Sequence, residues 1–167
     1  MTLVNRQTYR EAMARFGAAV SIVTTDGAAG RFGFTASAVT SVTDDPPTLR
    51  VCVNRKNDSH PALIANGVLC VSTLAASQEE ISNTFGGREA TQEARFAAGH
   101  WHALATGAPA LLGAVVAFDC RVVQVTEIGT HSVVFAEVVA IEHGSEHDGL
   151  VYFGRGYHRL RRPAGLP

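Results

Sequence analysis

Apolar and polar residues alternate over short runs through most of the chain, and β-branched residues dominate these runs. The pattern predicts strands at residues 19–24, 32–43, 48–53, 68–74, 114–126, 132–142 and 150–153. A few turn residues, such as Asp26-Gly27, separate many of them, and Asp44 to Pro47 are expected to interrupt the ladder. Such short connections favour an antiparallel barrel over a doubly wound parallel sheet.

Helical spacing of apolar residues interrupts this pattern at residues 8–16, 59–66, 77–85 and 92–98. Capping boxes are predicted at Thr8 to Glu11 and at Ser77 to Glu80, and Pro61 fits the first turn of a helix. Asn66-Gly67 and Gly86-Gly87 are expected to end two of these helices. No linker or repeat divides the 167 residues, so a single mainly β domain, residues 1–167, with a few helices is expected.

Composition narrows the function without identifying it. Hydrophobic residues make up 46% of the chain and charged residues 17%, which is typical of a compact globular protein. The net charge of −1 argues against binding to nucleic acid or to an anionic membrane. Cys52, Cys70 and Cys120 are odd in number and form no C-x-x-C pair, which predicts reduced core thiols and a cytoplasmic location.

Small residues follow one another from Gly33 to Ser41, within a predicted strand. On a regular strand Thr35, Ser37 and Val39 would share one face, and Ala36 and Ala38 the other. A flat ring can lie close to such a backbone, and a flavin needs hydrogen-bond donors at its edge because reduction builds negative charge there. A tightly packed strand with no ligand is the alternative interpretation.

The segment from Val53 to His60 places amides, a hydroxyl and two cations between a strand and a helix. Helix N–H groups and cations together suit a phosphate, although a solvated turn has the same composition. Phe85-Gly86-Gly87-Arg88 offers close backbone approach and a guanidinium, or simply a helix end.

Histidines suggest two further elements. Gly129-Thr130-His131 lies between two predicted strands, and Tyr157-His158 follows the last one. A histidine on a glycine turn can reach into a cleft, but an ordinary surface histidine fits equally well. His100 and His102 have no third ligand at a recognisable spacing, so no metal site is predicted. The glycines at 27, 30 and 33 do not form a G-x-G-x-x-G motif, which argues against a Rossmann site.

Together these segments resemble the flavin reductase components of two-component flavin-dependent monooxygenases, over roughly residues 9–160. Within that family the chain is most similar to the reductases of pyrimidine catabolism and of 4-hydroxyphenylacetate hydroxylation. The motifs that carry the resemblance are residues 33–39, 42–49, 52–55, 69–74, 85–87, 129–131 and 152–158.

The resemblance implies a Greek-key split β-barrel of the FMN-binding type, a homodimer, FMN or FAD, and NADH or NADPH as reductant. It further implies two sets of binding residues. The flavin would contact Thr35, Ala36, Ser37, Ala38, Val39, Asn54, Arg55, Ser59, His60, Phe85, Gly86 and Arg88. The nicotinamide would contact Gly129, Thr130, His131, Tyr157 and His158; the family pattern has Asp where this chain has Thr130.

The implied reaction is hydride transfer from the nicotinamide to flavin N5, which needs positioning and no enzymic acid. His131 is the candidate side chain nearest this chemistry, and reduced flavin is expected to diffuse to a partner oxygenase. A tight-binding flavoprotein oxidase of the same barrel is one alternative. A non-catalytic flavin- or haem-binding module is the other.

Overall fold

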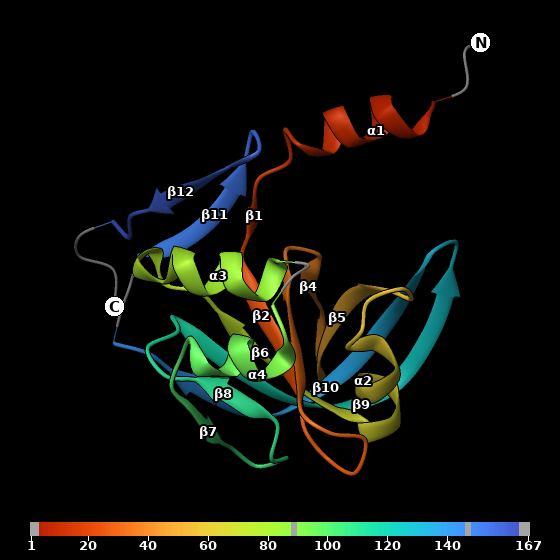
Figure 1. Ribbon diagram of the computed structural model, residues 1–167, viewed down its shortest axis with the longest axis vertical. Helices are drawn as coiled ribbons and strands as arrows, with labels where there is room; N and C mark the ends of the chain where they lie inside the picture. Colours follow the sequence, from red (N-terminus) through yellow and green to blue (C-terminus); the bar gives the residue numbers. More distant parts are fainter. Residues whose placement is uncertain (1–3, 88–89, 146–147, 164–167) are drawn as a thin grey trace.

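The computed structural model describes residues 4–87, 90–145 and 148–163, and its main element is a seven-stranded antiparallel sheet (Figure 1). The strand order is β3-β2-β6-β9-β10-β5-β4. Its strands are β2 (Ser21–Thr25), β3 (Phe32–Ala36), β4 (Val39–Asp44), β5 (Pro47–Asn54), β6 (Val68–Thr73), β9 (Val116–Ile128) and β10 (His131–His143). The predicted mainly β class is therefore confirmed.

Strands β3 and β4 follow each other in sequence but form opposite edges of this sheet. β3 pairs with β2, β4 pairs with β5, and the sheet curves until β3 also contacts β5. The chain crosses between the two edges at Ser37 and Ala38, which belong to neither strand. The fold is thus a split barrel, and the prediction of one strand over residues 32–43 is wrong. Small and β-branched residues continue through the crossing, so the sequence shows no break there.

The turn between β4 and β5 corrects a second prediction. Asp44 and Pro47 pair with each other, so residues 44–47 close a hairpin where the sequence predicted an interruption of the ladder. Pro46 lies in the turn, after a cis peptide bond, and Pro47 is the first residue of its strand. A missing N–H is tolerated at both places.

Two small sheets flank the barrel. One contains β1 (Ala18–Ala19), β11 (Gly149–Phe153) and β12 (Gly156–Leu160), and the other contains β7 (Trp101–Ala103) and β8 (Pro109–Leu111). Neither β7, β8 nor β12 was predicted, because each is short and lacks a clear alternation. Gly154 and Arg155 connect β11 to β12, and both have positive φ, of 61° and 65°. Two consecutive residues with positive φ form a hairpin turn whose twist matches that of the flanking strands. A positive φ is energetically unfavourable for Arg155, because it is not glycine.

Helix α1 (Arg6–Met13) projects away from the barrel and buries none of its residues (Figure 1). Its N-cap is Asn5, whose side-chain oxygen accepts a hydrogen bond from the Thr8 N–H. The helix therefore begins at Arg6, and the prediction of a capping box at Thr8 is wrong. It also ends at Met13, short of the predicted end beside Gly17.

The remaining helices are α2 (His60–Asn66), η1 (Ala76–Gln78), α3 (Glu79–Gly86) and α4 (Gln92–Ala97). α2 ends as predicted, because Gly67 adopts the left-handed conformation with φ of 67°. The capping box predicted at Ser77 is wrong, since Gln78 is the residue whose side chain accepts the Ala75 N–H. α3 and α4 pack against each other and against β3.

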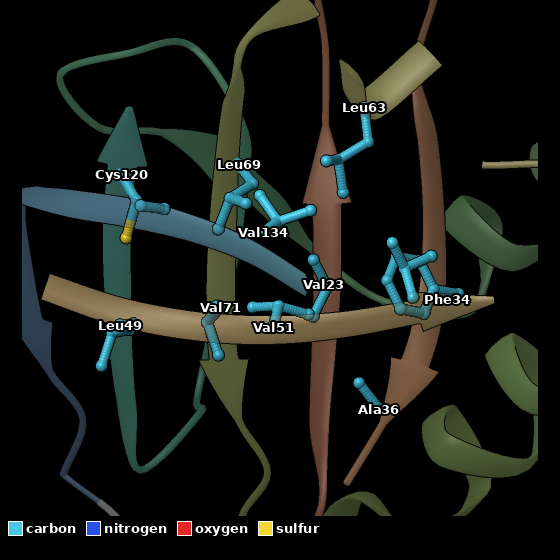
Figure 2. Close-up of a cluster of buried hydrophobic side chains, with 12 residues drawn as sticks. Val23, Phe34, Ala36, Leu49, Val51, Leu63, Leu69, Val71, Cys120 and Val134 are labelled. Atoms are coloured by element: carbon cyan, nitrogen blue, oxygen red, sulfur yellow. The ribbon is translucent and has the colours of Figure 1, made fainter. Parts of the chain in front are cut away.

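The barrel interior is filled by aliphatic side chains from several strands and from α2 (Figure 2). Val23, Val51 and Val71 are fully buried there, and Phe34 is 5% exposed. A second cluster joins α3 and α4 to the barrel through Phe85, Phe96 and Trp101, with ring centroids 5.1–5.4 Å apart. These two clusters fix the positions of β3 and α3, which carry Thr35 and Gly86 of the candidate site.

Two of the three cysteines are the core thiols that the sequence predicts. Cys70 and Cys120 are buried, and burial raises the pKa of the Cys70 thiol to about 12. Cys52 is only half-buried, which departs from the prediction. Within the described part of the chain, no helix is long and apolar enough to cross a membrane.

Candidate flavin site

A cavity of about 720 Å³ opens where the chain crosses from β3 to β4, and we call it the ring cavity. Ser37, Ala38 and Val39 form one wall of it. The end of α1, strand β5 and the β11–β12 hairpin supply the others, including Met13, Phe16, Arg50, Cys52 and Tyr152.

The wall formed by Ser37, Ala38 and Val39 differs from the predicted strand in one respect. All three residues line the ring cavity, so the predicted alternation of faces ends at Ala36, which is buried. The backbone leaves the strand at this point, and the Ala38 carbonyl accepts a hydrogen bond from the Cys52 N–H. The crossing presents small side chains and backbone to the cavity, as a bed for a flat ring requires.

The ring cavity is strongly cationic. Arg10, Arg50 and Arg155 line it, and none of its described lining residues is acidic. None of the three arginines takes part in an ion pair within residues 4–87, 90–145 and 148–163. In a chain of net charge −1, this concentration of positive charge suits an anionic ligand.

A second cavity, of about 570 Å³, lies on the other side of Thr35, and we call it the tail cavity. Phe34, Thr35, Phe85 and Gly86 line one side. The turn after β5 lines the other side, with Asn54, Lys56, Asn57 and Asp58. Thr35 in the tail cavity and Ser37 in the ring cavity are two residues apart, so the two cavities lie close together along the β3–β4 segment.

Asp58 is the carboxylate of the tail cavity, and it is held by α4. Gln92 Nε2 donates to Asp58 Oδ2 at 2.9 Å, and Arg95 Nη1 lies 3.5 Å from Asp58 Oδ1. Desolvation alone would raise the pKa of Asp58, but the Gln92 hydrogen bond and the Arg95 charge outweigh it and lower the pKa. Asp58 is therefore an anion at neutral pH, and its carboxylate already interacts with Gln92 and Arg95 of α4.

Three residues predicted to meet the flavin have other partners. The Arg55 side chain pairs with Glu127 at 2.6 Å and donates to the Gly129 carbonyl at 2.6 Å. Ser59 is 1% exposed and donates to the Gly33 carbonyl, and His60 Nε2 is 2.9 Å from Ser132 Oγ. None of the three lines either cavity. Arg88, also predicted, lies outside the described residues.

The residues predicted for the nicotinamide fall in two places. Gly129, Thr130 and His131 form the exposed end of the β9–β10 hairpin, and His131 pairs with Asn54. They line neither cavity within one chain.

Tyr157 lies near the predicted flavin residues, on β12. Its hydroxyl is 2.8 Å from Ser82 Oγ, and the Ser82 carbonyl accepts a hydrogen bond from Thr35 Oγ1 at 2.7 Å. Tyr157 is thus connected through α3 to the strand that precedes the ring cavity. His158 points elsewhere, to the Phe153 carbonyl at 3.0 Å.

Sequence reasoning missed most of the charged residues around the cavities. Arg10, Arg50 and Arg155 lie on three elements far apart in sequence, and only the folded chain brings them together. Lys56 was within the predicted phosphate turn but was not singled out. Arg95 is 6% exposed, and no local pattern marks it, because arginines are rarely buried.

The sequence model of the family described as "Flavin reductase like domain" matches residues 13–161 of this chain. The chain belongs to the flavin reductase family. This flavin reductase is 60% identical over 164 residues to the FMN reductase (NADH) RutF of Ancylobacter novellus, covering 98% of this chain and 88% of that protein. The resemblance to the family and the enzyme class are confirmed.

Solved structures agree with this assignment. A putative flavin reductase from Haemophilus somnus has a TM-score of 0.91 and 42% identity, covering 94% of this chain and all of that one. BorF, the flavin reductase component of a bacterial two-component tryptophan halogenase, has a TM-score of 0.88 and 29% identity, over 95% of this chain and all of BorF. The split-barrel fold of this flavin reductase is therefore shared with these proteins.

Proposed function

We propose that this flavin reductase uses NADH to reduce FMN and releases the product to a separate monooxygenase component. The observation that carries the proposal is the pair of cavities lined by neighbouring residues of the β3–β4 segment, one bounded by a bed of small residues and the other containing Lys56. A ring joined by a short polar chain to a phosphate has this shape. The name of the Ancylobacter relative supports FMN and NADH, and the role of BorF supports a separate partner enzyme.

The flavin is proposed to lie along the β3–β4 crossing. Ser37, Ala38 and Val39 would contact the ring, and Thr35, Asn54, Phe85, Gly86 and Arg88 the remainder. Ala36, also predicted to meet the ring, is buried and lines neither cavity, so it would support the crossing from behind. Since the side chains of Arg55, Ser59 and His60 are engaged by protein groups, we propose that they fix the turn around Lys56 and that Lys56 meets the phosphate.

The hydride donor is proposed to enter the open side of the ring cavity. NADH carries a pyrophosphate, and Arg10, Arg50 and Arg155 are placed to attract it. Gly129, Thr130, His131, Tyr157 and His158 remain our proposed nicotinamide residues. Because the first three line neither cavity of their own chain, a second subunit would have to present them.

A bound flavin would supply N5 as the acceptor of a hydride from a reduced nicotinamide. The protein's part is to stack the two rings with the reacting atoms about 3–3.5 Å apart. The described lining of the ring cavity contains neither histidine nor carboxylate, which fits a reaction driven by positioning. Backbone groups of Ser37 to Val39 would stabilise the negative charge that reduction builds on the ring.

We propose a homodimer, and the evidence that favours it is helix α1. Tyr9 and Met13 lie one turn apart on α1 and are 59% and 43% exposed, and Phe16, just beyond its end, is 69% exposed. Exposed apolar side chains on a projecting helix are typical of a protein interface. Light scattering of the Tyr9→Glu variant, which changes a residue outside both cavities, should show a lighter particle than the parent. We also propose a cytoplasmic location, which the three free cysteines support.

The activity is tested by following NADH oxidation with and without added flavin. The proposal expects the rate to depend on added FMN and to saturate with it. A purified protein that retains flavin and ignores added FMN would indicate the oxidase. Absence of NADH oxidation at any flavin concentration would indicate a binding module, and either result would overturn the proposal.

A further inference from the structure

Two side chains of α4, one turn apart, hold the backbone of a single residue of β3. Gln92 Oε1 accepts the Gly33 N–H at 2.9 Å, and Arg95 Nη1 donates to the Gly33 carbonyl at 3.0 Å. β3 is an edge strand, so its outward backbone groups have no strand to pair with, and the Gly33 carbonyl has Ser59 Oγ at 3.2 Å as its other donor. α4 therefore takes the place of the missing neighbouring strand at this one residue.

The same two side chains reach two other walls of the tail cavity. Both contact the Asp58 carboxylate in the turn after β5, and Arg95 Nη2 donates to the Gly87 carbonyl at 2.9 Å, just after α3. Three segments far apart in sequence thus meet on one helix. They are the segments that carry Thr35, Lys56 and Gly86, which line the cavity.

Arg95 lines the tail cavity, but its side chain is committed mainly to protein groups. Its side chain is 8% exposed, and its Nη atoms are engaged by two carbonyls and one carboxylate. Its Nε is buried and has no hydrogen-bond partner among the residues that the structure describes. A buried guanidinium is costly unless its geometry is well satisfied, which makes the position sensitive to substitution.

We propose that Arg95, assisted by Gln92, is a positioning residue that shapes the tail cavity for the flavin phosphate. The inference rests on the proposed function. It predicts that the pair sets the preference for FMN over riboflavin, which has the same ring but no phosphate. A ring bound at Ser37 to Val39 would depend much less on α4 than a phosphate held beside Lys56.

The test measures Kd for FMN and for riboflavin by flavin fluorescence, in the parent and in three variants. Arg95→Lys keeps the charge but replaces two Nη atoms by a single nitrogen, which cannot span the Gly33 and Gly87 carbonyls as the planar guanidinium does. Gln92→Ala keeps Arg95 and removes the contacts with the Gly33 N–H and the Asp58 carboxylate. Glu93→Ala, an exposed residue on the same helix, is the control. We expect Kd for FMN to rise about tenfold in Arg95→Lys and about threefold in Gln92→Ala. Kd for riboflavin should change less than twofold, and the control should match the parent.

Equal weakening of both ligands in Gln92→Ala would show a merely structural role and overturn the proposal, as would unchanged binding of both. If Arg95→Lys fails to fold by circular dichroism, the Gln92→Ala result decides alone. The outcome is separable from the reductase activity. A parent protein that binds FMN more tightly than riboflavin but oxidises no NADH would overturn the proposed function and leave the role of Arg95 open to this test.

Discussion

A Cβ atom built on Gly33 would lie 2.7 Å from Cε1 of Phe85, so the Phe85 ring rests directly on the backbone of β3. Phe85 is 1% exposed and packs against Phe96 and Trp101. The contact places α3 close to the strand that leads into the ring cavity. It also explains why glycine is needed here, although the φ angle of Gly33 is not positive.

Gly33→Ala should therefore destabilise the protein. The added methyl group must displace a buried ring that packs against Phe96 and Trp101, and overpacking of this kind costs about 1–3 kcal/mol. Urea unfolding should show a lower midpoint with an unchanged slope. Gly107→Ala is not a suitable control because its φ is 90°, whereas Gly149→Ala has free space around the new methyl group. A Gly33→Ala variant as stable as the parent would contradict the close contact.

Arg155 combines a positive φ with a place in the ring cavity. Arg155→Gly removes the guanidinium and relieves the backbone, so the free energy of unfolding should stay the same or rise by up to about 1 kcal/mol. The KM for NADH should rise about three- to tenfold, because one charge-assisted contact is lost. The KM for FMN should change little. Arg121→Gln, an exposed arginine of β9 outside both cavities, should leave both KM values unchanged.

Cys52 lines the ring cavity, whereas the other two cysteines are buried. Burial raises the pKa of Cys70 to about 12 and raises that of Cys120 as well, so neither forms thiolate at pH 8. Iodoacetamide should label Cys52 alone in the folded protein, as peptide mass spectrometry would show. Bound FMN should slow this labelling. Labelling at an unchanged rate in saturating FMN would place the flavin elsewhere.

Asp58 predicts a particular pH dependence of stability. Its pKa is lowered from 3.8 in the folded protein, so its contribution to stability is present above the ordinary value. The contribution is lost as the pH falls through the lowered pKa. The difference in free energy of unfolding between the parent and Asp58→Asn should be largest near neutral pH and shrink below about pH 4. A difference that does not vary between pH 7 and pH 3 would show that the charge of Asp58 plays no part.

Local signals in the sequence were sufficient for much of the fold. Runs of β-branched residues located the long strands, and Pro61 with Asn66-Gly67 gave the limits of α2 within a residue. The same reasoning failed where partners decide the structure. Residues 32–43 have uniform strand character, yet pairing with β2 on one side and β5 on the other divides them at Ser37 and Ala38.

The candidate site shows the same division. Its wall of small residues was predicted, since small side chains are visible in the sequence. The partners of Arg55 and His60 were not, because Glu127 and Ser132 lie about 70 residues further along the chain. The burial of Arg95 could not be foreseen either, as its three acceptors come from three separate segments.

The crossing at Ser37 and Ala38 has a consequence for synthesis on the ribosome. These residues emerge among the first forty, each beside a hairpin that can form early, β2–β3 before them and β4–β5 after them. The two hairpins are held apart by β6, β9 and β10, and β10 ends at His143. A nascent chain therefore cannot complete the wall of the ring cavity until β6, β9 and β10 have emerged and paired. Capture of FMN would mark an assembled sheet.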